Sequence, residues 1–209
     1  MTIKLVGSSS GSVSIAAPAT TSGGANRVLT LPDINSTIDT TGRAGNILQV
    51  VSVTKTDTTS LASSTWHKIS GLQPSITPSS TSSKILIQAS FCIGASSKSA
   101  DTPLKLFRSV GGSDTDIGLG DAAGNRTRCF WGTEDWFGNN NASDGSIYLT
   151  VSANTNFLDS PNTTSAITYG VSWRITSGHA VYLNRTGQDN DSSNYPRGSS
   201  TITLMEVAA

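Results

Sequence analysis

The most constraining feature of this sequence is a strict two-residue alternation between residues 166 and 176. Large apolar side chains occupy every second position, and the positions between them hold small or polar residues; the large ones are Ile167, Tyr169, Val171, Trp173 and Ile175. Successive side chains of a β-strand point to opposite faces of a sheet, so these five share one face. The run therefore predicts a half-buried strand that is central to a core.

Eight further apolar runs of strand length lie between Asn46 and the last residue, and loops rich in Gly, Ser, Asn and Pro separate them. They are residues 47–53, 66–72, 84–93, 104–110, 128–131, 147–151, 180–183 and 201–207. No window of ten residues shows the 3.6-residue spacing of an amphipathic helix. Many short strands between turns predict an all-β fold, an antiparallel β-sandwich or jelly roll.

The composition agrees with β-structure and excludes some classes of partner. Only 35% of the residues are hydrophobic and 13% are charged, and Ser, Thr, Gly and Asn dominate the remainder. Fourteen Lys and Arg residues balance fourteen Asp and Glu residues, so no attraction to nucleic acid is expected. The sequence lacks the apolar stretch of a signal peptide and any run of eighteen apolar residues, which predicts no membrane insertion and synthesis in a cytosol.

Residues 1–44 differ from the rest of the chain. They contain no aromatic residue, and their two apolar runs, residues 12–15 and 27–31, are separated by Gly, Pro, Ser and Thr. So little apolar surface cannot offset the entropy of ordering the segment, which therefore needs a partner surface. We expect an extended N-terminal segment over residues 1–44 and a single head domain over residues 45–209.

Two short segments fit the residue patterns of enzyme motifs but lack the structural context that these motifs require. Residues 7–11 satisfy G-x-S-x-G and residues 118–123 satisfy G-x-G-x-x-A, but neither is followed by the helix that these motifs require. Of the two histidines, His67 is expected in a strand and His179 in a hairpin turn between Ile175 and Val181. We therefore expect a protein that is not an enzyme and binds no cofactor.

Acidic side chains could bind a metal ion or act as the carboxylate pair of a glycosidase. Asp114, Asp116 and Asp121 could supply oxygen ligands to Ca²⁺, as could Asp189 with Asp191, but neither cluster has EF-hand spacing. Solvated turn carboxylates are the favoured interpretation. Glu134 and Asp135 are adjacent, so in a strand they would point to opposite faces, and no catalytic pair is predicted.

One loop combines aromatic, acidic and amide side chains, which suit stacking on a sugar and hydrogen bonding to it. It supplies the candidate glycan or receptor contacts, which are Trp131, Glu134, Asp135, Trp136 and Asn139. The alternative is that Phe130, Trp131 and Phe137 fill the core or a subunit interface. The two cysteines, Cys92 and Cys129, lie in apolar runs and are expected to be free buried thiols, with a disulfide as the alternative.

The N-terminal segment resembles one that is common in bacteriophage virion appendage proteins. Residues 11–18 match its "G-x-V-x-L-x-A-P" run, residues 27–33 contain its "T-L-P", and residues 36–38 match its "G-T-I" close with Ser36 in place of the glycine. The remainder is similar to the C-terminal jelly-roll heads of phage tail or capsid fibres, particularly those of marine cyanobacterial phages. The topology of those heads resembles that of tumour-necrosis-factor-like trimers.

The resemblance implies a homotrimer in the virion, assembled in the cytoplasm of a bacterial host. Residues 1–44 would anchor it to other tail or capsid proteins, and the heads would contact the host or the capsid. Leu104 and Leu106 on one strand face and Phe107 on the other are consistent with a sheet that also packs against a neighbour. The alternatives are a capsid cement or decoration protein and a lectin-like adhesin that binds a host surface glycan.

Overall fold

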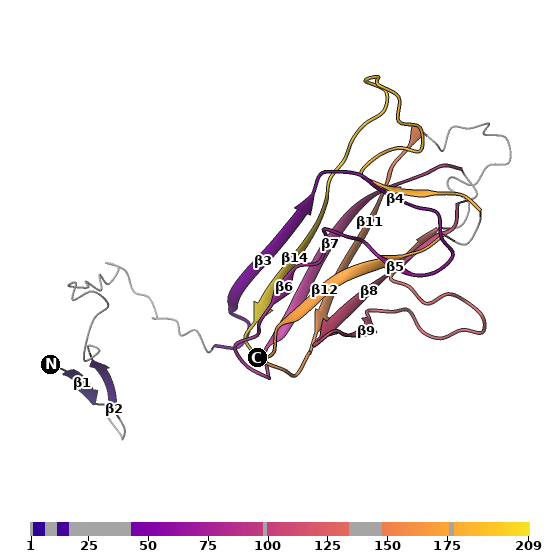
Figure 1. Ribbon diagram of the computed structural model, residues 1–209. Helices are drawn as coiled ribbons and strands as arrows, with labels where there is room; N and C mark the ends of the chain where they lie inside the picture. Colours follow the sequence, from indigo (N-terminus) through magenta and orange to yellow (C-terminus); the bar gives the residue numbers. More distant parts are fainter. Residues whose placement is uncertain (1, 7–11, 17–42, 98–99, 134–147, 176–177) are drawn as a thin grey trace. The chain divides into compact units, whose positions relative to one another are not determined.

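The computed structural model describes residues 2–6, 12–16, 43–97, 100–133, 148–175 and 178–209 (Figure 1). Backbone contacts divide the chain into two compact units, residues 1–39 and residues 40–209. The division lies five residues before the boundary that the sequence predicts. No helix in the described segments is long and apolar enough to span a bilayer.

The first unit contains a two-stranded antiparallel sheet. Its strands are β1 (Thr2–Val6) and β2 (Ser12–Ala16), and they pair so that Thr2 lies opposite Ala16 and Val6 opposite Ser12. A two-stranded sheet with five residues in each strand is at best marginally stable in water. This unit therefore has little stability of its own.

The second unit contains two antiparallel sheets. The first sheet has the order β3-β14-β7-β13-β4, with β11 paired to β7. Its strands are β3 (Ile47–Lys55), β4 (Thr59–Leu61), β7 (Lys84–Ala95), β11 (Val151–Asp159), β13 (Val181–Leu183) and β14 (Ser200–Val207). Strands β3 and β14, the first and last of the unit, are neighbours.

The second sheet has the order β10-β8-β12-β5, with β6 paired to β12 and β9 paired to β8. Its strands are β5 (His67–Lys68), β6 (Ser75–Ile76), β8 (Thr102–Val110), β9 (Ser113–Ile117), β10 (Trp131–Thr133) and β12 (Ile167–Trp173). From β7 onward the chain passes between the two sheets several times, as in a jelly roll. The predicted all-β, antiparallel sandwich is confirmed.

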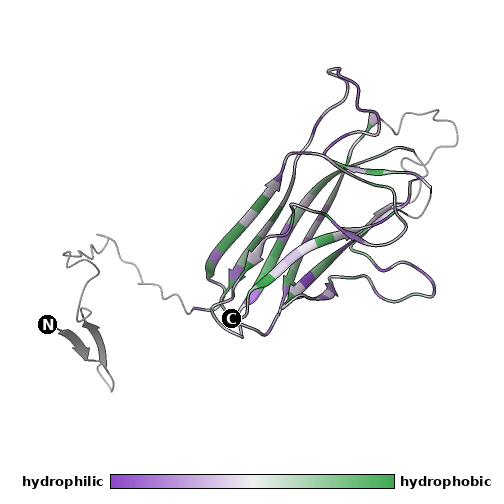
Figure 2. Ribbon diagram, in the orientation of Figure 1, coloured by the Kyte–Doolittle hydropathy of each residue, from purple (hydrophilic) through white to green (hydrophobic). Residues whose placement is uncertain are grey.

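The core lies between the sheets and is built from the alternating positions of the strands. Its largest fully buried side chains include Trp173 and Tyr169 from β12 and Phe91 from β7. The predicted alternation from Ile167 to Trp173 is therefore correct, and this strand lies beside β8 within its sheet. Figure 2 shows hydrophobic residues in the strands and mainly hydrophilic residues in the loops that join them.

One ion pair lies inside the sandwich near the end of β11. Asp159 accepts hydrogen bonds from Arg108 Nη1, at 2.9 Å, and from the hydroxyl of Tyr169, at 2.7 Å. The Asp159 side chain is 7% exposed and the Arg108 side chain 23%. Burial, followed by the nearby Asp159 carboxylate, raises the pKa of Tyr169 above its usual range, so the phenol remains a donor. The three residues join β8, β11 and β12.

The structure corrects several predicted elements. β11 covers residues 151–159, whereas the sequence suggested a strand over 147–151, because the inward positions of β11 include the weakly apolar Ala153 and Thr155. β9 lies within residues 111–126, which were expected to form a loop. His179 does not lie in a hairpin turn, since β12 and β13 belong to different sheets and do not pair.

Candidate functional site

The outward surface of the first sheet is a regular grid of uncharged side chains. Three outward positions from each of four strands, β3, β14, β7 and β11, align through the strand registers into three rows, and the exposed Lys84 lies at the next outward position of β7, beyond Leu86. We call this grid the uncharged face; it consists of Val50, Ser52, Thr54, Thr201, Thr203, Met205, Leu86, Gln88, Ser90, Asn154, Asn156 and Leu158. None of the twelve side chains ionises near neutral pH.

The first row of the uncharged face is apolar across all four strands. Val50 lies opposite Met205, Met205 opposite Leu86, and Leu86 opposite Leu158. Val50 is 56% exposed and Leu158 is 47% exposed. A contiguous exposed apolar row on a domain that already has a complete core indicates a contact surface.

The other two rows are formed by hydroxyl and amide side chains. The hydroxyls of Ser52 and Thr203 are 2.8 Å apart, and those of Thr54 and Thr201 are 2.9 Å apart, so both pairs are hydrogen-bonded across β3 and β14. A shallow depression of about 370 Å³ lies over β14, β7 and β11. Its lining includes Gln88, Asn154 and Asn156, which offer amide donors and acceptors without charge.

The outward surface of the second sheet is charged instead. Lys68 pairs with Asp114 at 2.7 Å, and Lys105 pairs with Asp116 at 2.5 Å. These pairs account for two of the carboxylates that were considered as Ca²⁺ ligands. The described residues contain no cluster of three or more His, Cys, Asp or Glu side chains that could hold a metal ion.

Phe107 lies on this charged surface, where the sequence suggested contact with a neighbouring subunit. Its side chain is only 1% exposed in the single chain. The ammonium of Lys68 lies 4.5 Å from the ring centroid, and Gly170 leaves room for the ring, since a Cβ there would lie 2.7 Å from Phe107 Cζ. The second apolar face of β8 is thus covered from within the chain, and the explanation by a neighbour is wrong.

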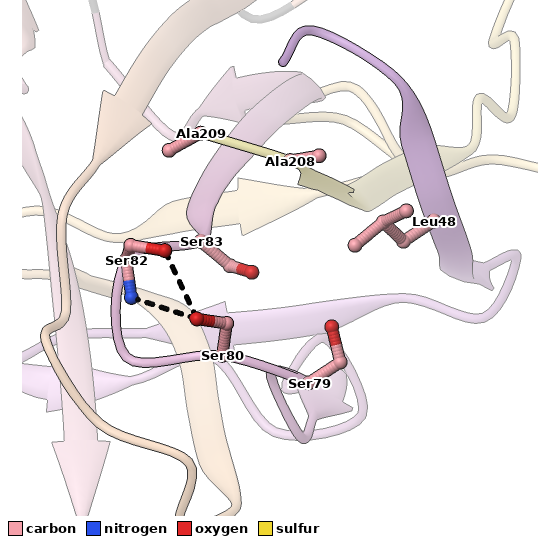
Figure 3. Close-up of a pocket in the computed structure, with 7 residues that line it drawn as sticks. All are labelled: Leu48, Ser79, Ser80, Ser82, Ser83, Ala208 and Ala209. Carbon is pink, nitrogen blue, oxygen red and sulfur yellow. Dashed lines mark hydrogen bonds between the residues drawn. The ribbon is translucent and has the colours of Figure 1, made fainter. Parts of the chain in front are cut away.

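A cavity of about 490 Å³ opens where β3 begins and β14 ends (Figure 3). Four serines and three apolar residues line it, namely Leu48, Ser79, Ser80, Ser82, Ser83, Ala208 and Ala209. The side chain and amide of Ser82 are hydrogen-bonded to the Ser80 hydroxyl. The lining offers hydroxyl groups, and the one of Ser79 donates to the carboxylate of Glu206.

The carboxylate of Glu206 is 1% exposed and is held by neutral donors close to this cavity. It accepts hydrogen bonds from the Ser79 amide at 2.7 Å, from the Ser79 hydroxyl at 2.6 Å and from Gln49 Nε2 at 2.6 Å. Burial by itself would raise the pKa of Glu206, but these hydrogen bonds and one from Ser83 outweigh it and lower the pKa to about 2. The group is a charged structural anchor for the loop before β7.

Of the predicted glycan contacts, Trp131 lies within the described residues. Trp131 lies in β10 opposite Leu104 and packs, partly buried, against the core, as does Phe130. Glu134, Asp135, Trp136 and Asn139 lie outside the described residues, and so does Phe137. The glycan site at this loop therefore stays a prediction.

The histidines and cysteines do not assemble a reactive site among the described residues. His67 lies in β5, as predicted, and its Nε2 is 3.0 Å from the hydroxyls of both Ser63 and Thr65. Cys92 and Cys129 are free thiols and are only half-buried. Burial raises the pKa of the Cys129 thiol, which lowers its reactivity at neutral pH.

No protein-family model matches this chain, and no curated protein is similar to it. Among solved structures, it is similar to a chain of infectious bursal disease virus Gt strain, with 12% identity and a TM-score of 0.36 over 98% of this chain. The Gx strain gives 13% identity and a TM-score of 0.35 over 98% of the chain.

A third match is the VP2 subviral particle of infectious bursal disease virus, with 10% identity and a TM-score of 0.35 over 88% of this chain. In all three cases the match covers 46% of the other chain, so this chain spans about half the length of the solved chains. A likeness at this level says nothing about function.

Proposed function

We propose that this chain is a non-catalytic structural protein of a bacteriophage virion, a trimeric fibre or appendage. Its residues 45–209 form the head that associates with other copies, and residues 1–44 attach it to tail or capsid proteins. The observation that carries the proposal is the uncharged face, an exposed four-stranded surface with a continuous apolar row.

The uncharged face suits contact with a second copy of the same chain. In a symmetric oligomer, the same residues are buried in every copy. Charged residues are depleted at the core of interfaces, and like charges brought together weaken association. The twelve residues of the uncharged face include none and Lys84 borders it at the start of β7, whereas the opposite surface holds Lys68, Lys105, Asp114 and Asp116.

The N-terminal unit supports the attachment role. Its two five-residue strands, β1 and β2, form a sheet that is too small to be stable alone, so a partner surface must supply the remaining free energy. The resemblance to phage appendage proteins supports other virion proteins as that partner. The localisation that follows is the virion, assembled in the bacterial cytoplasm.

Two measurements on the full chain test the proposal. Light scattering after gel filtration should give three times the mass of the chain, which is 21.6 kDa. Immunogold labelling of purified phage particles should place the protein on the tail or the capsid. A monomer would contradict self-association, and particles without the protein would contradict the virion role.

A further inference from the structure

A cluster of aromatic and cationic side chains on the second sheet has no part in the proposed function. Trp66 lies just before β5 and is half-buried, so part of its ring is exposed. Lys105 Nζ lies 4.4 Å from the centroid of this ring, and the guanidinium carbon of Arg174 lies 5.1 Å from it. The ring and the two cations form a single cluster.

Arg174 carries the excess positive charge of this cluster. Lys105 is paired with Asp116, and the nearby Lys68 is paired with Asp114. Within the described part of the chain, no carboxylate lies within ion-pair distance of Arg174. An anion that approaches this surface is therefore attracted to the Arg174 guanidinium.

The hydrogen bonding of Arg174 is also incomplete. Its Nη2 donates to the hydroxyl of Thr127 at 2.9 Å, whereas its buried Nε has no acceptor in the structure. Because Nε is buried, an anion meets this side chain through its charge and its terminal Nη groups, not through Nε.

Hydroxyl and imidazole groups surround the cluster. The amide of Ile175 donates to the carbonyl of Ser63 at 2.9 Å, which places the segment 63–67 beside Arg174. Within that segment, the Ser63 and Thr65 hydroxyls are exposed or half-buried and lie 3.0 Å from His67 Nε2. Such groups exchange hydrogen bonds with the hydroxyls of a sugar, and an exposed tryptophan ring packs against its C–H groups.

We propose that Trp66, Thr127 and Arg174 form a binding site for an acidic saccharide. The carboxylate or sulfate of the sugar pairs with the positive charge and the terminal Nη groups of the half-buried Arg174 guanidinium. The exposed Thr127 hydroxyl bonds a second ligand oxygen, and the sugar ring packs on Trp66. This site lies on the opposite sheet from the uncharged face, so it does not depend on the proposed self-association.

Isothermal titration calorimetry with the full chain tests the site. The probes are a galacturonic acid trisaccharide, a sulfated galactose oligosaccharide and the neutral galactose trisaccharide. At least one acidic probe should bind about tenfold more tightly than the neutral one, and raising NaCl from about 50 to about 500 mM should weaken that binding. The better of the two acidic probes identifies the anion. Equal binding of acidic and neutral probes, or no binding of either acidic probe, would overturn the proposal.

Variants assign the binding to these residues. Arg174→Lys keeps the charge but loses the paired donors, so it should weaken binding of the acidic probe about tenfold. Thr127→Val, in an exposed loop, should weaken it severalfold. Arg126→Lys is the matched control, because Arg126 is exposed and, among the described residues, its side chain bonds the carbonyl of Ala123.

Unchanged binding in both Arg174→Lys and Thr127→Val would show that the saccharide binds elsewhere. A thermal melt confirms that each variant is folded, and the Thr127 variant keeps the test valid if Arg174→Lys does not fold. Light scattering of the same samples reports self-association separately. Failure of the saccharide site is thus distinguishable from failure of the proposed function.

Discussion

The hydroxyl of Ser200 donates a hydrogen bond of 2.6 Å to the side-chain carbonyl of Asn184, and this contact joins the start of β14 to the end of β13. The amide group of Asn184 donates to the carbonyls of Lys55 and Asp57, at 2.8 and 2.9 Å. Ser200 in turn accepts from the amide of Cys92. Asn184 is fully buried, so its side chain satisfies two backbone carbonyls after β3 and fixes the Ser200 hydroxyl that bonds β7.

Asn184→Ala should therefore cost about 3 kcal/mol of unfolding free energy, because it leaves buried acceptors without donors. Urea denaturation followed by tryptophan fluorescence measures the loss. Asn162→Ala is the matched control, since Asn162 also has a positive φ, of 53° against 62°, but is exposed. Its cost should be about 1 kcal/mol. Equal costs for the two variants would mean that the network contributes nothing.

Glu206 makes stability depend on pH on the acid side. Its folded pKa of about 2 lies below its unfolded value, so its contribution is fully present above about pH 5 and is lost as the pH falls toward 2. Glu206→Gln should lower the free energy of unfolding at pH 7 by about 2–3 kcal/mol. It should also make that free energy depend less on pH between about pH 5 and pH 2. Urea midpoints between pH 2.5 and pH 7 measure both effects, at about half-unit steps.

The exposed loop carboxylate variant Asp121→Asn is the control for this series. It should follow the wild-type curve closely at every pH, because it removes a charge without removing a buried hydrogen-bonded group. A Glu206→Gln curve that runs parallel to the wild type would contradict the assigned role of the carboxylate.

Gly94→Ala should prevent the normal packing of β7 against the segment after β13. A Cβ at Gly94 would lie 2.1 Å from the carbonyl oxygen of Arg185, and both groups belong to backbone that cannot move alone. We expect a loss of about 3 kcal/mol or more, measured by thermal and urea unfolding. Gly178→Ala has open space around its Cβ and should change stability by less than about 1 kcal/mol.

Charge placed in the apolar row should dissociate the oligomer without unfolding the head. Val50→Lys and Leu158→Lys each put a cation where an interface on this face would bury it without a partner. Sedimentation velocity should show loss of the trimer, while circular dichroism keeps its β-sheet signal. Thr115→Lys, at an exposed position of β9 on the other sheet, should remain trimeric. A trimer in all three variants would exclude the uncharged face as the interface.

Strands could be predicted where apolar and polar side chains alternate clearly, and they were missed where this alternation is weak. The run from Ile167 to Trp173 predicts a central strand because every inward side chain is large. β11 was missed because Ala153 and Thr155 fill inward positions in a run rich in Ser and Asn. The uncharged face could not be predicted at all, since Val50, Leu86, Leu158 and Met205 meet only through strand register, which depends on the assembled sheet.

The pairing of the first strand of the head with the last one has a mechanical consequence. Gly45 donates a hydrogen bond of 2.7 Å to the carbonyl of Ala208, and β3 then runs antiparallel to β14 from Ile47 to Lys55. A pulling force applied through residue 44 acts along β3 and loads its hydrogen bonds to β14 together, in shear. Sharing the load in this way resists rupture better than opening the bonds one at a time. Tension on the attachment would therefore be borne by the ladder between β3 and β14, whose register is regular from Gln49 to Lys55.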